Sequence, residues 1–216
     1  MTILRTSRLN SLLLSALCAG LLLAPVSREA AAAAAVDTSS PATLIQTASD
    51  AMLKDLEANR AKYRKDKTGL YKLVDDILLP NFDVDYAGQQ VLGAHWRTAT
   101  PEQRTRFIKG FYRSLLQTYG DALVDFTSDR MKVLPFQPGS NPDRATVRTQ
   151  VRRDGGDQVA VNYSLRKADA GWKVWDVVIE GISYVKSFRE DYGAEVNANG
   201  LDALIKRLEA PNASPK

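Results

Sequence analysis

The segment from Lys173 to Phe188 restricts the fold more than any other part of the chain, because its hydrophobic period changes part-way along. Up to Glu180, apolar residues alternate with other residues, which is typical of a strand with one apolar face. Beyond Gly181 they recur every third residue, as on one side of a helix. The two sets are Trp175, Val177 and Ile179, then Ile182, Val185 and Phe188. We therefore expect a strand that turns directly into a helix, with two apolar faces bordering one space.

The chain before residue 120 has helical periods. We expect helices over residues 41–65, 70–78, 83–96 and 100–119. Asp83 is suited to cap the third helix. Thr100-Pro101-Glu102-Gln103 has the pattern of a capping box with proline at the first helical position.

Beyond residue 129 the period is two. Four segments alternate or are rich in β-branched residues, and turn sequences such as Asp154-Gly155-Gly156-Asp157 separate them. These segments are residues 131–136, 144–153, 159–166 and 172–180. The Tyr184 helix and a last helix over residues 201–208 follow. The order predicts an α+β domain in which a curved antiparallel sheet of about four strands has helices before and after it.

The first 35 residues have the composition of a secretory signal. Arg5 and Arg8 precede the apolar run Leu12–Ala24, and an alanine tract follows at Ala30–Ala35. The apolar run is shorter than the roughly 20 residues that span a bilayer. We expect a cleaved signal peptide over residues 1–35, a single domain over 36–210 and a polar tail over 211–216.

Cleavage also changes the composition. It removes the only cysteine, Cys18, so the mature chain has no disulfide. Loss of Arg5, Arg8, Arg28 and Glu29 from 29 basic and 25 acidic residues leaves 26 and 24. A nucleic-acid-binding protein typically has a clear excess of basic residues, which this nearly equal number of basic and acidic residues lacks. We expect a periplasmic protein with no nucleic-acid partner.

Side chains suited to catalysis are scarce. His95 is the only histidine and no cysteine remains after cleavage, so we expect neither a catalytic triad nor a zinc site. The acidic residues Asp75, Asp76, Asp83 and Asp85 are better explained by helix capping and solvation than by a metal. We therefore expect no enzyme, no catalytic residues, no metal and no cofactor.

Two alternatives stay open. Asp176 lies on a central strand, where a carboxylate could serve an isomerase of the same fold as base, although alternation places it opposite Val177. A sealed core would instead indicate a ligand-free adaptor. A basic stripe, Arg106, Lys109 and Arg113, is a solvated face or a docking surface for acidic partners.

Several motifs resemble the MlaC family of periplasmic phospholipid-binding proteins, also called the toluene-tolerance family. They are Tyr86-Ala87-Gly88 with Val91-Leu92-Gly93 and His95-Trp96; the helix from Thr100 through Phe107, Phe111 and Leu115 to Thr118-Tyr119-Gly120; and Val174-Trp175-Asp176-Val177 with Glu180-Gly181-Ile182-Ser183 and Phe188-Arg189. The resemblance implies a nuclear-transport-factor-2-like fold that encloses an apolar cavity. It also implies a non-enzymatic carrier, with glycerophospholipid as cargo. The partners it implies are an inner-membrane ABC transporter complex with its periplasmic lipid-binding subunit and an outer-membrane lipoprotein–porin complex, in a pathway that maintains outer-membrane lipid asymmetry.

The apolar faces predict the residues that enclose the acyl chains. They are Phe111, Leu115, Tyr119, Val147, Val151, Val161, Tyr163, Trp175, Val177, Ile179, Tyr184, Val185 and Phe188. An empty apolar cavity of about 800 Å³ would destabilise the fold by on the order of 20 kcal/mol. We therefore expect a lipid-free form to narrow its pocket.

Overall fold

The computed structural model describes residues 36–124, 127, 130–153 and 155–210. The predicted signal peptide and the predicted polar tail lie outside the described residues. Among the described residues, no helix is both long and apolar enough to cross a membrane.

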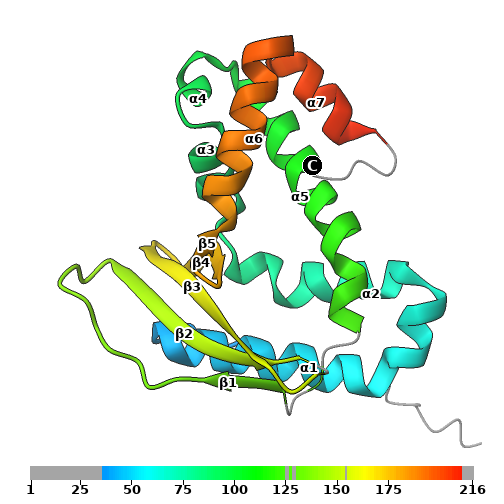
Figure 1. The fold of residues 1–216 in the computed structure, drawn as a ribbon, viewed down its shortest axis with the longest axis vertical. Coiled ribbons are helices and arrows are strands. Elements are labelled where there is room, and N and C mark those ends of the chain that lie inside the picture. Colours follow the sequence, from blue (N-terminus) through cyan, green and yellow to red (C-terminus); the bar gives the residue numbers. More distant parts are fainter. Residues whose placement is uncertain (1–35, 125–126, 128–129, 154, 211–216) are drawn as a thin grey trace, which may run out of the picture. The chain divides into compact units, whose positions relative to one another are not determined.

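The helices come in two groups, before and after the strands (Figure 1). Before the strands lie α1 (Pro41–Lys65), α2 (Lys67–Ile77), the 3-10 turn η1 (Leu79–Asn81), α3 (Val84–Leu92), α4 (His95–Thr98) and α5 (Pro101–Val124); after them lie α6 (Tyr184–Asn199) and α7 (Leu201–Glu209). The capping box of α5 is confirmed, since the Gln103 amide donates to Thr100 Oγ1 at 3.1 Å and the Thr100 amide donates to Gln103 Oε1 at 3.0 Å. Asp83 caps α3, as predicted.

The strands form one antiparallel sheet, β1-β2-β3-β4-β5. Their bounds are β1 (Met131–Val133), β2 (Arg144–Arg152), β3 (Gln158–Ala168), β4 (Gly171–Ile179) and β5 (Ile182–Ser183). The α+β prediction is therefore confirmed. The fifth strand was not predicted: Ile182 pairs with Ile179 instead of entering the helix, and its side chain is 63% exposed.

A bulge in β4 corrects the predicted strand face. On β3, Ser164 pairs with Asp176 and the next residue pairs with Val174, so Trp175 has no partner. Val174 therefore shares a face with Val177, and Trp175 turns to the opposite face. There its ring meets Tyr86 edge-on at 5.4 Å between ring centroids. The prediction that Trp175 lies on the same face as Val177 and Ile179 is wrong.

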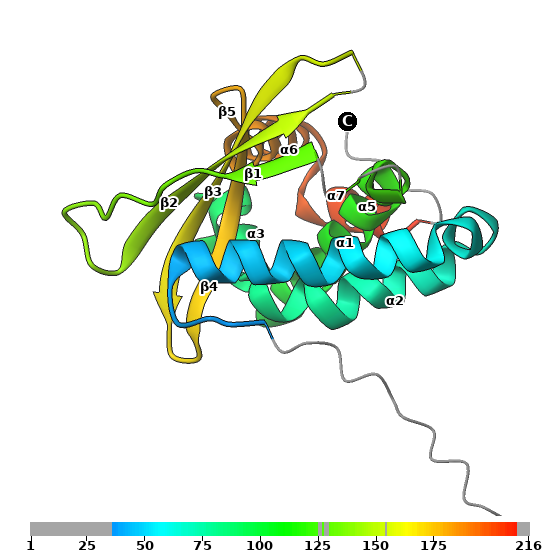
Figure 2. The same cartoon turned by 90° about the horizontal axis from the view of Figure 1, so that it is seen from below.

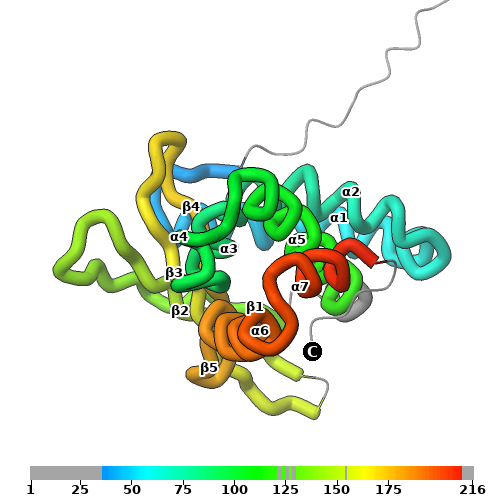
Figure 3. The backbone as a smooth tube through the Cα atoms, turned by 90° about the horizontal axis from the view of Figure 1, so that it is seen from above, coloured from blue at the N-terminus to red at the C-terminus, as the bar shows by residue number. Residues whose placement is uncertain are grey.

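The two faces of the sheet meet different helices. Helix α1 crosses one face of the sheet (Figure 2). There its residues Leu44 and Ile45 are buried with Val147 on β2. The other face of β4 is met by α3 and α6. Helix α7 lies beside α5 and α6 (Figure 3), and Arg106 on α5 forms a two-bond ion pair with Glu209 of α7. One residue of the basic stripe, Arg106, is thus paired within the protein.

Candidate functional site

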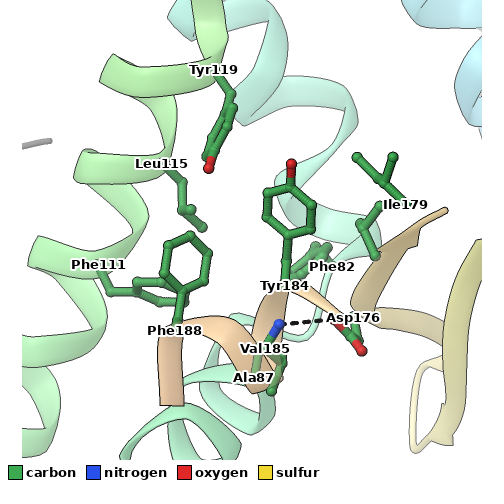
Figure 4. Close-up of a pocket in the computed structure, with 11 residues that line it drawn as sticks. Phe82, Ala87, Phe111, Leu115, Tyr119, Asp176, Ile179, Tyr184, Val185 and Phe188 are labelled. Atoms are coloured by element: carbon green, nitrogen blue, oxygen red, sulfur yellow. Dashed lines mark hydrogen bonds between the residues drawn. The ribbon is translucent and has the colours of Figure 1, made fainter. Parts of the chain in front are cut away.

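A cavity of about 250 Å³, the main chamber, lies between α5, α6 and the end of β4 (Figure 4). Its lining is almost entirely apolar. The residues are Phe82, Ala87, Phe111, Leu115, Tyr119, Asp176, Val177, Ile179, Tyr184, Val185 and Phe188. Strand β4 and helix α6 are joined by the short β5 hairpin, which brings the predicted sheet face and helix face to one space.

Aromatic contacts connect the α5 and α6 walls. Phe111 meets Phe188 edge-on at 5.4 Å, and Tyr119 meets Tyr184 at 5.8 Å. Tyr119 is 38% exposed, and it also lines a second cavity of about 300 Å³ that we call the mouth. The mouth is lined by Tyr119, Ile179, Glu180, Ile182, Tyr184, Ser187, Phe188 and Asp191. The chamber therefore adjoins an opening with exposed apolar groups at its rim.

Burial affects the titration of Tyr119 at this end of the chamber. Burial raises the pKa of the Tyr119 phenol above its ordinary value, and the nearby Tyr184 hydroxyl raises it further. A phenol ordinarily titrates near pH 10, so Tyr119 adds no charge to the chamber wall near neutrality.

Asp176 is the one carboxylate in the lining, and both of its oxygens are engaged. Ser183 Oγ donates to Oδ2 at 2.6 Å, and the Val185 amide donates to Oδ1 at 3.0 Å. Ser183 Oγ also accepts from the Lys186 amide and so caps α6. Alternation had placed Asp176 away from the cavity, but the turn into α6 brings it to the chamber wall. Its contacts indicate that it fixes the start of α6.

Most of the predicted lining residues meet at the main chamber. Those that do are Phe111, Leu115, Tyr119, Val177, Ile179, Tyr184, Val185 and Phe188. Five do not: Val147 is buried against α1, Val151 and Val161 pack in a separate cluster on β2 and β3, Tyr163 lines a different cavity, and Trp175 is turned away by the bulge. The four residues on β2 and β3 share one reason: these strands lie on the α1 side of the domain, whereas the end of β4 reaches the chamber.

Besides Asp176, two lining residues, Phe82 and Ala87, were missed. They flank the Asp83 cap, one position before it and four after it. Apolar residues at these two positions form the hydrophobic staple that commonly accompanies a capped helix. This pattern is readable in the sequence and would have indicated an apolar contact at the start of α3.

Smaller apolar cavities continue from the main chamber. One of about 150 Å³, the side chamber, shares Phe82 and Leu115 with it. Another of about 130 Å³ shares Leu78 and Leu123 with the side chamber and reaches Tyr163 on β3. Neighbouring cavities share lining side chains, so rotation of these side chains would change the usable volume.

In the part of the chain that the structure describes, no group of His, Cys, Asp or Glu side chains is arranged to hold a metal ion. The main chamber offers a ligand almost exclusively apolar contacts.

Comparison with known proteins agrees with this geometry. A sequence model described as MlaC protein matches residues 46–210. The chain belongs to the MlaC family. It is 27% identical, over 84% of its length and 86% of the relative's, to the intermembrane phospholipid transport system binding protein MlaC of Haemophilus influenzae. It is 32% identical to the toluene tolerance protein ttg2D of Pseudomonas putida, over 77% of this chain and 78% of that one.

One solved structure of a family relative has its ligand. The phospholipid-binding protein of Ralstonia solanacearum, in complex with a phospholipid, superposes with a TM-score of 0.71 at 26% identity. The match covers 76% of this chain and 92% of that one.

Proposed function

We propose that this protein is a periplasmic carrier that takes the acyl chains of a glycerophospholipid into the main chamber and its neighbours. The observation that carries the proposal is the almost entirely apolar wall formed by β4, α5 and α6, in which the single carboxylate, Asp176, is already hydrogen-bonded. The phospholipid-bound relative and the names of the other relatives support it.

Energetics favour acyl chains as the occupant. Two chains hold about 30 methylenes, whose full burial contributes on the order of 25 kcal/mol before the costs of ordering and binding. The described cavities are each much smaller than two such chains need. Loading therefore requires Phe82, Leu115 and their neighbours to move aside, as expected for a pocket that narrows when empty.

The sequence and the family support a more specific proposal about the protein's partners. The predicted signal peptide and single mature domain suit a protein that moves freely between two membranes. We infer that it exchanges lipid with an inner-membrane ABC transporter complex, through that complex's periplasmic lipid-binding subunit, and with an outer-membrane lipoprotein–porin complex. This exchange would maintain outer-membrane lipid asymmetry.

Lipid retention by chamber variants tests the carrier function. The mature protein, purified from bacteria, is analysed by native mass spectrometry and lipid extraction. Wild type is expected to retain phospholipid. Val177→Asp places a charge in the apolar wall and should abolish retention.

A second variant covers the case in which Val177→Asp fails to fold. Leu115→Trp fills the boundary between the main and side chambers and should lower lipid occupancy several-fold in a folded protein. Ala203→Trp on the exposed side of α7 is the matched control and should retain lipid like wild type. A lipid-free wild type, or unchanged lipid in both chamber variants, would contradict the proposal.

A further inference from the structure

A cavity of different chemistry, the polar cavity, shares Phe82 with the main chamber. Its volume is about 350 Å³. Its lining includes two lysines and two aspartates: the full set is Leu79, Phe82, Asp83, Val84, Asp85, Ile108, Lys109, Tyr112 and Lys173.

Three elements build the polar cavity. The segment between η1 and α3 is tied to β4, because Phe82 bridges to Val174 and the Asp83 amide donates to the Val174 carbonyl at 2.6 Å. This contact sets Lys173, the residue before Val174, beside the segment. Helix α5 closes the cavity with Lys109 and its neighbours.

The charges in this lining are unequally paired. Asp83 pairs with Arg166 of β3 and accepts from the Tyr86 amide. Among the residues that the structure describes, Lys109, Lys173 and Asp85 form no ion pair. Two ammonium groups against one carboxylate remain available, so the cavity favours an anion.

The polar cavity shares lining side chains with the apolar cavities and lies next to them. Leu79, Phe82, Val84 and Tyr112 line the polar cavity and also the side chamber. Phe82 in turn lines the main chamber. A molecule with a charged end and a long apolar end could place the first at Lys109 and Lys173 and the second beyond Phe82.

We propose that the polar cavity binds the phosphate of the lipid headgroup, with Lys109 and Lys173 as its cationic contacts. The inference rests on the proposed carrier function and adds the side from which the lipid enters. A phosphate cannot follow the acyl chains inward, because an unpaired charge in an apolar chamber is strongly destabilised. The mouth beside Tyr119 suits it poorly, since the charged residues in its lining are the carboxylates Glu180 and Asp191.

Paired lipids and paired variants test this assignment. The mature protein is equilibrated with vesicles of dioleoyl phosphatidylethanolamine or with dioleoylglycerol, which has the same chains and no phosphate. The Lys109→Gln/Lys173→Gln double variant is compared with Lys132→Gln/Lys186→Gln, which removes equal charge at exposed positions outside the polar cavity. Occupancy is read by native mass spectrometry. Glycerophosphoethanolamine, which has no chains, is titrated separately.

We expect the lysine substitutions to weaken binding of the lipid that has a phosphate and not of the lipid that lacks one. The first double variant should bind the phospholipid on the order of 10- to 100-fold more weakly, which is about 1.4 to 2.7 kcal/mol for the two lost contacts together, and should bind dioleoylglycerol unchanged. The control variant should bind both lipids like wild type. Equal loss of both lipids, or no loss of either, would overturn the headgroup site but leave the carrier function standing.

Two further outcomes separate the sources of phosphate. If glycerophosphoethanolamine binds as tightly as the intact lipid, the cavity is a site for soluble phosphoesters and the lipid assignment is wrong. If wild type binds neither lipid, the carrier function fails first and the headgroup site fails with it.

Discussion

At the scale of single residues, Asp176, the one charged side chain in the lining of the main chamber, holds the turn into α6. It is only 4% exposed and holds the amide of Val185 and the hydroxyl of Ser183. Asp176→Ala leaves both donors without an acceptor, so we expect the free energy of unfolding to fall by about 2–4 kcal/mol. Urea denaturation followed by circular dichroism measures this. Asp191→Ala, at an exposed position on α6, should change stability by less than about 0.5 kcal/mol.

A variant of Asp176 also distinguishes the carrier function from the alternative of an enzyme. Asp176→Asn keeps one oxygen that can accept from Val185, so this variant should lose less stability than Asp176→Ala and still bind lipid. Loss of turnover of a small carbonyl compound in Asp176→Asn, with lipid binding intact, would instead favour the isomerase.

Glu180 is the only described non-glycine residue in the left-handed region, with φ of 50°. With Gly181 at φ of 85°, it forms the tight turn between β4 and β5. Asparagine tolerates this conformation better than glutamate, and the exposed 3.8 Å ion pair of Glu180 with Arg153 contributes little. We expect Glu180→Asn to raise the free energy of unfolding by about 0.5–1 kcal/mol.

The same substitution at a helical position should change stability in the opposite direction. Glu190→Asn, at an exposed position inside α6, replaces a good helix former and should lower stability by about 0.5 kcal/mol. Equal thermal shifts for the two variants would contradict the backbone explanation of Glu180.

At the scale of elements, the start of α5 is fixed by its capping box and by α7. Gln103 accepts from the Thr100 amide through Oε1 and donates to Asp202 on α7 through Nε2 at 2.9 Å. Thr100→Ala removes the acceptor for the Gln103 amide, and we expect a loss of about 1 kcal/mol in chemical denaturation. Thr105→Ala, one turn later on the exposed side, should be neutral or slightly stabilising; a similar loss there would contradict the capping argument.

Most elements could be predicted from the sequence because the residues that determine each one lie close together in the chain. The caps at Asp83 and Thr100 and the alternation on β2 depend on residues only a few positions apart. The bulge at Trp175 does not, since it is defined by pairing with β3. Ile182 was misassigned because its spacing to Val185 fits a helix, whereas pairing with Ile179 makes it a strand residue.

The candidate site was harder to predict than the fold for a related reason. Alternation shows that Val147, Val161 and Val177 share a sheet face, but not which helix covers each part of it. Helix α1 covers the part at Val147, so that residue became core instead of chamber wall. Which helix packs on which part of the sheet depends on contacts between segments about 100 residues apart. The hydrophobic pattern within one strand carries no information about such contacts.

At the scale of the whole molecule, the main chamber links stability to cargo. If a cavity of 250 Å³ were sealed and empty, it would destabilise the fold by about 6 kcal/mol, a large part of the roughly 5–15 kcal/mol available. A lipid that binds the folded state alone adds stability in proportion to the logarithm of its concentration. We expect protein stripped of lipid to melt several degrees below the loaded form in differential scanning calorimetry.

Readdition of phosphatidylethanolamine should restore the melting temperature. Leu115→Trp is the informative comparison, because a chamber already filled by a side chain should show a smaller shift between stripped and loaded protein. An identical shift in the variant would mean that the lipid stabilises the protein from somewhere else.

The connection between β4 and α6 also affects how the family can vary. Glu180, Gly181, Ile182 and Ser183 are the only residues between the last wall residue on the strand, Ile179, and the first on the helix, Tyr184. Inserting or deleting one of them would rotate every position of α6 by about 100° around its axis. Substitutions in the wall therefore have graded effects, whereas a change of length here would turn Tyr184 and Phe188 away from the chamber together. Insertions and deletions among functional relatives should be rarer in this connection than in the β2–β3 hairpin.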